Sequence, residues 1–195
     1  MGAGGGVKIE SIWDGDRLLT IIIIKGWNWM FHRKTYDSFT ELEKDSLELG
    51  FKIYGDCDEY SNKFELISLT DKGCNCGVVY YDHGIGLQVL PLNGTVNLLI
   101  GFEKSIVGIN CITKSELVQK KSISLFYEFL ETPEFVVAVC ELDLYVFDKA
   151  CKLLWSSGFR DIIEDYKVLN DGVVSVQCSN GDKLEFDLKT GTTLR

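Results

Sequence analysis

The sequence predicts a mainly β (α+β) fold, in which antiparallel, blade-like hairpin repeats follow an N-terminal hairpin and one helix. Residues 136–155 and 173–195 carry the clearest repeat. Each has an apolar strand, a tight polar turn, a second alternating strand, an aspartate and a short third segment. Turn pairs also recur at intervals of 39 residues, a period typical of repeat architectures. These pairs are Asn93-Gly94, Thr132-Pro133 and Asp171-Gly172.

Composition and charge favour a globular protein and argue against a membrane-spanning or nucleic-acid-binding one. The chain has 195 residues, 46% of them hydrophobic and 25% charged, which is typical of a globular protein with a sizeable core. The longest apolar run, residues 18–24, is far shorter than the roughly 20 residues that cross a bilayer. A net charge of −9 argues against nucleic-acid binding, because lysine and arginine provide the affinity for phosphates. Seven cysteines without an export signal indicate reduced thiols and a cytoplasmic protein.

Three segments are expected along the chain. Residues 1–7 begin MGAGGG and are expected to form a flexible leader. Residues 8–50 are expected to hold a hairpin, a strand and the helix. Residues 51–195 show only strand and turn patterns, so we expect a β-repeat region that packs with the preceding segment as a single domain.

Turn and capping residues define the elements before residue 51. Asp14-Gly15 stands between two β-rich runs, which is a strong hairpin signal. Ser38 has Glu41 three residues later, the spacing of a capping box at the start of a helix. Gly50 is a typical residue at a helix C-terminus. The helix is therefore expected between Ser38 and Gly50.

Residues 144–155 and 183–194 resemble the repeats of quinoprotein-type β-propellers. In that family a strand ends in aspartate, a Thr-Gly turn follows, and the next strand closes on tryptophan. Asp187, Thr190 and Gly191 match the turn, while Asp148 and Trp155 match the ends of the preceding unit. The resemblance implies a blade-like antiparallel sheet and no particular activity, because such blades serve enzymes and scaffolds alike.

The number of repeats leaves no room for a ring of six to eight blades. Counting upstream from the turn pairs gives at most four units, the first beginning near Tyr54. We therefore expect an open or incomplete propeller-like array. Cys151 and Lys152 replace the family's Thr-Gly pair in one unit, yet Asp148 and Asp187 stand at equivalent corners. Both aspartates are expected to accept hydrogen bonds from the turn that follows.

The sequence contains no motif that indicates catalysis, and we expect a protein that is not an enzyme. The two histidines, His32 and His83, are too few for a His-rich metal site. Cys74-Asn75-Cys76 is the nearest approach to a metal motif, and Cys57 or His83 could complete four zinc ligands. However, structural zinc sites usually use a CxxC knuckle. Two cysteines in a glycine-flanked loop are the favoured interpretation, with no metal and no cofactor.

The favoured function is a non-catalytic protein-binding module. In size, charge and lack of motifs, the chain resembles in type the immunity proteins that neutralise basic nuclease toxins in bacterial competition. That resemblance implies a basic toxin domain as the partner, occluded by acidic loops whose charge raises association rate and specificity. The residues expected to bind the partner are Asp56, Asp58, Glu59, Glu141, Asp143, Asp161, Glu164 and Asp165.

Two alternatives stay open. Trp27 and Trp29 alternate along a strand and could form a platform for a small molecule or glycan, although core packing is commoner for such a stripe. The chain could also be a scaffold subunit of a larger assembly. The sequence does not determine the oligomeric state.

Overall fold

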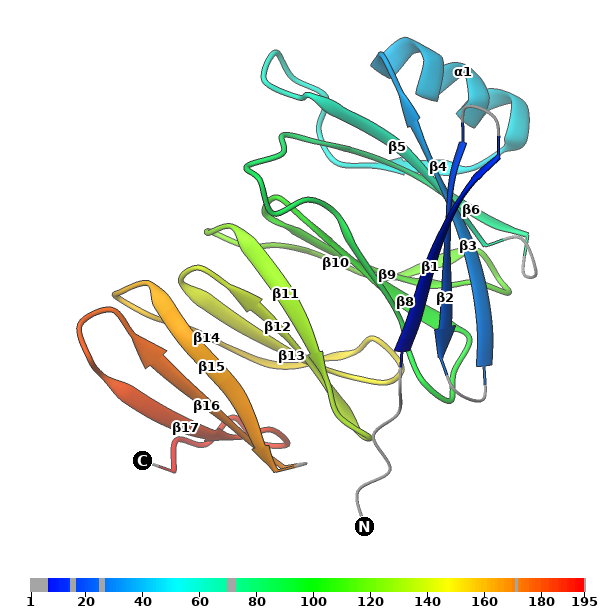
Figure 1. Cartoon of the computed structure of the whole chain (residues 1–195). Coiled ribbons are helices and arrows are strands. Elements are labelled where there is room, and N and C mark those ends of the chain that lie inside the picture. The colour runs from blue at the N-terminus through cyan, green and yellow to red at the C-terminus, as the bar shows by residue number, and fades with distance from the viewer. Residues whose placement is uncertain (1–6, 15–16, 25–26, 70–72, 171, 195) are drawn as a thin grey trace. The chain divides into compact units, whose positions relative to one another are not determined.

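The computed structural model describes residues 7–14, 17–24, 27–69, 73–170 and 172–194, with side chains from His32 onward (Figure 1). Contacts group the chain into two compact units. Unit 1 comprises residues 1–82 and 111–114, and unit 2 comprises residues 83–110 and 115–195. The expected single domain and its boundary at residue 50 stay predictions, because a grouping of contacts does not test independent folding.

Unit 1 is a six-stranded sheet with one helix. Its strands lie in the order β1-β2-β3-β5-β6-β4, and every pair is antiparallel except β4 with β6. The expected hairpin is present, since Asp14 at the end of β1 pairs with Arg17 at the start of β2. The elements are β1 (Val7–Asp14), β2 (Arg17–Ile24), β3 (Trp27–Tyr36), α1 (Phe39–Leu49), β4 (Lys52–Tyr54), β5 (Lys63–Leu69) and β6 (Cys74–Tyr80).

Helix α1 begins and ends as its capping residues predict. Ser38 has an extended backbone, and its Oγ accepts a hydrogen bond from the Glu41 N–H over 3.4 Å. Gly50 adopts a left-handed conformation at φ 68°, and its N–H donates to the Ser46 carbonyl over 2.9 Å. Leu42 is fully buried in the cluster between helix and sheet. These caps satisfy end groups that the helix itself leaves unpaired.

A glycine on β6 lets the helix side of the sheet pack closely. A Cβ on Gly77 would lie 2.9 Å from Cγ1 of Ile53, 3.1 Å from Phe51 and 3.3 Å from Leu42. Such separations are shorter than ordinary van der Waals contact. Any larger residue at this position would therefore push the helix and β4 away from the sheet.

Unit 2 consists of three antiparallel sheets, which we call the first, second and third blades. Figure 1 shows them in chain order, coloured green, yellow and orange to red. Strand order is β10-β9-β8-β7, then β11-β12-β13-β14, then β15-β16-β17. The strands are β7 (Gln88–Pro91), β8 (Asn97–Phe102), β9 (Ser105–Asn110), β10 (Ser115–Lys121), β11 (Phe126–Glu131), β12 (Phe135–Cys140), β13 (Asp143–Asp148), β14 (Leu153–Gly158), β15 (Ile163–Asn170), β16 (Val173–Cys178) and β17 (Lys183–Asp187).

The blades are joined by backbone hydrogen bonds that recur from one blade to the next. At the start of β11, the Phe126 N–H donates to the Glu103 carbonyl of the first blade over 2.6 Å. At the start of β15, the Ile163 N–H donates in the same way to the Glu141 carbonyl of the second blade over 2.9 Å. The sequence repeat is therefore also a repeat of tertiary contacts.

The two turn aspartates have the structural role that the repeat predicts. Oδ1 of Asp148 accepts hydrogen bonds from the N–H groups of Ala150 and Lys152, both over 2.9 Å. Oδ1 of Asp187 accepts from the Thr190 N–H over 2.7 Å and from its hydroxyl over 2.8 Å. These bonds favour the charged carboxylate, so the Thr190 hydroxyl, followed by its N–H, lowers the pKa of Asp187.

Both turns contain a residue with a left-handed backbone after the aspartate, although the turn of the third blade is one residue longer. Cys151 and Gly191 adopt left-handed φ angles of 63° and 71° at corresponding turns. Only Gly191 also faces a ring, since a Cβ there would lie 2.8 Å from Trp155. The Trp155 indole N–H donates to the Leu188 carbonyl over 2.8 Å. Tryptophan at the end of one unit thus holds the turn of the next.

Two core clusters lie between consecutive blades, so the fold is an open stack of blades. Val136 and Ala138 of β12 belong to the cluster shared with the first blade, and Val137 and Val139 to the cluster shared with the third. The predicted fold class is confirmed. The unit expected to begin near Tyr54 is not a separate blade, because β5 and β6 pair within the sheet of unit 1. Among the described residues, no helix has the length and apolar character needed to cross a membrane.

Candidate partner-binding surface

Residues 56–60, between β4 and β5 of unit 1, form an exposed acidic loop. Asp56, Asp58 and Glu59 are all exposed, and this segment contains no lysine or arginine. Tyr60 follows them with 66% of its surface exposed. Carboxylates beside an exposed tyrosine are well suited to a basic protein surface, because tyrosine is frequent among the residues that dominate binding energy. We call residues 56–60 the acidic loop.

Hydrogen bonds order the acidic loop before any partner binds. Oδ1 of Asp58 accepts from the N–H groups of Tyr60 and Ser61, both over 2.9 Å. The Ser61 hydroxyl donates to the same oxygen over 3.0 Å and accepts from the Asp58 N–H over 3.1 Å. The Ser61 hydroxyl, followed by the Tyr60 N–H, lowers the pKa of Asp58. Asp58 is therefore charged at neutral pH, and its hydrogen bonds order the loop.

The base of the acidic loop is tied to the end of β6. The Asn62 N–H donates to the Tyr80 carbonyl over 3.2 Å. The Asn62 side-chain oxygen in turn accepts from the Asp82 N–H over 2.9 Å. The first contact joins the loop to the last residue of a buried strand, and the second joins it to the segment that follows this strand. Both limit the motion that binding would have to restrict.

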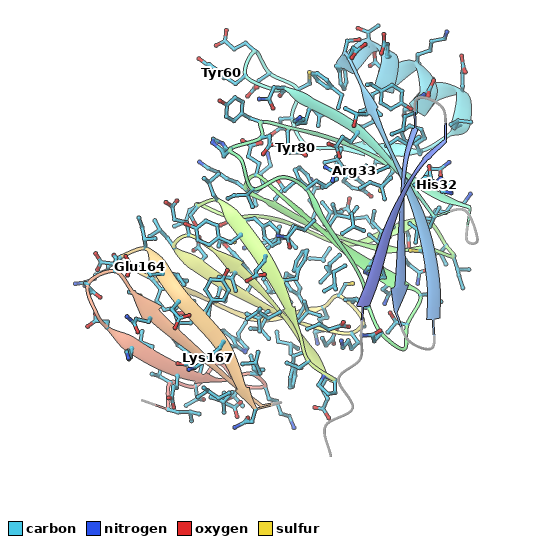
Figure 2. All side chains as sticks on the ribbon, in the orientation of Figure 1. His32, Arg33, Tyr60, Tyr80, Glu164 and Lys167 are labelled. Atoms are coloured by element: carbon cyan, nitrogen blue, oxygen red, sulfur yellow. The ribbon has the colours of Figure 1, made fainter. Side chains whose placement is uncertain are left out.

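A largely buried polar cluster joins β3, β5 and β6 of the same sheet; Figure 2 labels two of its residues, Arg33 and Tyr80. Arg33 forms a two-point ion pair with Glu65, one contact of which joins Nη2 to Oε1 over 2.8 Å. The Tyr80 hydroxyl donates to the same Oε1 over 3.2 Å and accepts from Arg33 over 3.2 Å. Glu65 and Tyr80 are 3% and 1% exposed, and burial raises the pKa of Tyr80. The charges satisfy one another, so the cluster supports the sheet.

The remaining predicted contact residues lie in unit 2 and differ in exposure. Glu141 and Asp161 are half-buried, whereas Glu164 and Asp165 are exposed on β15. Figure 2 shows Glu164 and Lys167 on this same strand. Lys167, also exposed, places a positive charge beside the two carboxylates. These residues form a more mixed surface than the acidic loop.

Asp143 faces inward, although its sequence neighbourhood looks like an acidic turn. The side chain is 6% exposed. Its Oδ2 accepts from the Ser122 hydroxyl over 2.9 Å and from the Ser124 hydroxyl over 2.8 Å. A carboxylate so enclosed stabilises the loop between β10 and β11. We therefore leave Asp143 out of the proposed binding surface.

The other predicted sites have different outcomes. Trp27 and Trp29 belong to β3, where their backbones pair with those of Ile24 and Ile22 of β2. Their side chains are outside the described residues, so the ligand platform stays a prediction.

Cys74 and Cys76 are buried on β6 rather than in a loop. Within the described part of the chain, no group of three or more His, Cys, Asp or Glu side chains is placed to hold a metal ion.

Sequence reasoning did not single out the exposed Tyr60. Its signal was available, since it directly follows the run Asp56-Cys57-Asp58-Glu59. It also missed a contact between Glu128 of β11 and Tyr166 of β15, the first strands of the second and third blades. Burial, followed by the hydrogen bond with Glu128, raises the pKa of Tyr166. That pair has no local sequence signal, because its members lie on different blades.

Comparison with known proteins gives a limited result. No family model matches the chain, and no curated protein matches it. Among solved structures, BamB from Moraxella catarrhalis is similar over 73% of this chain and 47% of its own, at 11% identity and a TM-score of 0.45. Hsv2 from Kluyveromyces lactis is similar over 68% of this chain and 57% of its own, at 9% identity and a TM-score of 0.32.

The chain spans about half the length of BamB. Scores of this size do not establish a shared fold, and the blades are defined by their own strand pairing.

Proposed function

We propose that the chain is a non-catalytic protein-binding module whose acidic loop docks a basic protein partner. The observation that carries the proposal is the combination of three exposed carboxylates with the exposed Tyr60 on a loop that is already hydrogen-bonded. Such ordering avoids part of the entropy that binding removes, about 0.5–1.5 kcal/mol for each immobilised flexible side chain.

The partner class that best fits this chemistry is a basic nuclease-type toxin domain. A nuclease must gather lysine and arginine around its active site, because its substrate is a chain of phosphates. Asp56, Asp58 and Glu59 present negative charges to such a surface, and Tyr60 supplies apolar contact area. Binding would occlude the nuclease site sterically, with no chemical step. The cytoplasmic location and the absence of enzymatic activity are parts of the same proposal.

The test is binding of the full chain to a panel of purified basic nuclease toxin domains, followed by surface-based kinetics at several salt concentrations. Asp56→Asn with Glu59→Gln should slow association several-fold and reduce its salt dependence, because exposed charges mainly steer encounter. Tyr60→Ala should instead raise the dissociation rate about tenfold or more. Asp58 is left unchanged in the charge variant because it orders the loop.

The matched control is Glu43→Gln with Glu48→Gln on α1. It removes the same charge from exposed positions and should leave both rates almost unchanged. Loss of inhibition of the nuclease by the loop variants, with retention by the control, supports occlusion. A complex whose rates respond to neither salt nor the loop substitutions contradicts the proposal.

A further inference from the structure

The loop between β7 and β8 carries one of the chain's two Asn-Gly steps. These steps are Asn93-Gly94 in the first blade and Asn180-Gly181 in the third. An asparagine followed by glycine can cyclise, because a residue without a Cβ lets its backbone nitrogen approach and attack the preceding side-chain amide. Both asparagines and both glycines are exposed. The local sequence therefore makes the two sites chemically alike, and only the fold can separate them.

The two turns use their glycine N–H groups differently. In the first-blade loop, the turn hydrogen bond runs from the Thr95 N–H to the Leu92 carbonyl over 3.2 Å, so the Gly94 N–H takes no part in it. Gly94 has φ 77°, as the third residue of a type II turn does. In the third-blade turn the Gly181 N–H is itself the donor, to the Cys178 carbonyl over 2.9 Å. A nitrogen that must lose its proton before it attacks is held back by such a bond.

Asn93 is also part of a junction between the first and second blades. Its side-chain Nδ2 donates to Oε2 of Glu131 over 2.8 Å, and its backbone N–H donates to Oε1 over 3.0 Å. Glu131 ends β11, and its carboxylate forms an ion pair with Lys149 of the same blade. The Glu131 and Lys149 side chains are each only 16% exposed. A change of charge at Asn93 therefore acts on a partly enclosed carboxylate.

We propose that Asn93 is a site of spontaneous deamidation, a covalent modification whose only co-reactant is water. The Gly94 nitrogen attacks Cγ of Asn93, the Cγ–Nδ2 bond breaks, and the proton of the Gly94 N–H leaves with the amide nitrogen as ammonia. Water then opens the cyclic imide at either of its carbonyls, which gives aspartate or isoaspartate. The net change replaces NH2 by OH. Asn180 is protected while the chain is folded, because the nitrogen beside it is engaged in its own turn.

The contact with Glu131 slows this reaction. The nitrogen that leaves is Nδ2, and its hydrogen bond to Oε2 of Glu131 must break before ammonia departs. Removing the Glu131 carboxylate should therefore speed deamidation at Asn93 and have no effect at Asn180. The modification site is independent of the proposed partner binding, since the acidic loop belongs to unit 1 and this junction to unit 2.

The product places a second carboxylate beside Glu131. Deamidation removes the donor at Nδ2 and substitutes a negative charge, so that two carboxylates lie side by side. Like charges repel, and they do so more strongly where the side chains are partly enclosed than in open solvent. Isoaspartate also lengthens the backbone of the turn. Both effects loosen the junction between the first and second blades, so modified chains should unfold at a lower temperature.

The first experiment incubates the full chain at mildly alkaline pH and follows both asparagines by peptide mapping with mass spectrometry. A sample unfolded in guanidinium chloride is the reference, because there each Asn-Gly step reacts according to its local sequence alone. The ratio of the folded to the unfolded rate should be several-fold higher at Asn93 than at Asn180. Glu131→Ala should raise the folded rate at Asn93 several-fold and leave that at Asn180 unchanged. A ratio at Asn93 equal to or below that at Asn180 overturns the proposal.

The second experiment measures the effect on the junction. Asn93→Asp reproduces one product and should lower the thermal midpoint by several degrees. In a Glu131→Gln background the same substitution should cost much less, because no second carboxylate remains to repel it. An equal loss in both backgrounds contradicts the proposed repulsion. The peptide maps of the wild-type chain decide the modification itself even if one of these variants fails to fold.

Discussion

The three strands of the third blade are connected in the same order as the first three of the second, but the middle strands of these triplets are buried differently. β12 reads FVVAVC and is buried at all six residues, whereas β16 reads VVSVQC and alternates between half-buried and buried. Val137 and Val139 of β12 pack toward the third blade. The corresponding residues of β16 are Ser175 and Gln177, which are half-buried.

The difference extends to the neighbouring strand. Leu144 and Val146 of β13 belong to the core between the second and third blades. The matching positions of β17 are Lys183 and Glu185. A strand buried on both faces reads as a continuous apolar run, while one buried on a single face alternates. The outer face of the third blade is therefore polar, unlike the corresponding face of the second blade.

The largest expected difference between the two blades is the loss of stability when an aspartate is placed at the matching position of each. Val137→Asp puts a carboxylate in the core between blades and should destabilise the protein by about 3–5 kcal/mol or prevent folding. Ser175→Asp places the same carboxylate on the outer face and should cost about 1 kcal/mol or less. Urea unfolding of both variants measures the difference. Equal losses would show that the third blade is covered as fully as the second.

A smaller effect is expected at the turn where the third blade meets Trp155 of the second. Gly191→Ala combines a left-handed φ of 71° with a Cβ 2.8 Å from the indole ring. We expect a loss of about 2–4 kcal/mol from strain and overpacking together. Gly181→Ala is the matched control, because φ is 89° there but nothing lies within 4 Å of the added Cβ. If thermal unfolding shows the same loss in both, the ring contact contributes nothing.

The smallest effect on stability should come from giving the third blade the outer face of the second. The combined variant Ser175→Val, Gln177→Val and Glu185→Val changes only half-buried positions, so the unfolding free energy should change by about 1 kcal/mol or less. The new apolar face should instead make the chain self-associate. Analytical ultracentrifugation over a range of concentrations measures this, with Ser175→Val alone as the control. A strictly monomeric triple variant would contradict a solvent-facing third blade.

Local patterns were sufficient for the elements whose signals are local. Ser38 and Gly50 mark the helix because capping involves residues within one turn of it. Asp148 and Asp187 were predicted to form turns for the same reason, since their hydrogen-bond donors lie two to four residues further on. In the candidate site, the same kind of reasoning located the acidic loop from Asp56, Asp58 and Glu59.

Contacts between distant segments were beyond such patterns. Asp143 follows Glu141 by two residues and looks equally exposed in the sequence, but Ser122 and Ser124 enclose only Asp143. β5 and β6 have ordinary strand patterns, and nothing in them distinguishes a fourth blade from part of a six-stranded sheet. Strand pairing uses backbone groups that every residue carries, so a strand's pattern does not name its partner.

The sequence by itself determined that this is a mainly β protein of blade-like repeats with one capped helix, and it located Asp148 and Asp187 at equivalent turns. Only the tertiary structure decided which strands pair and which acidic residues remain at the surface. The physical reason is the range of the interactions. Capping, turn formation and alternation act within a few residues, whereas burial and side-chain contact depend on segments that folding brings together, as with Asp143 and Ser122.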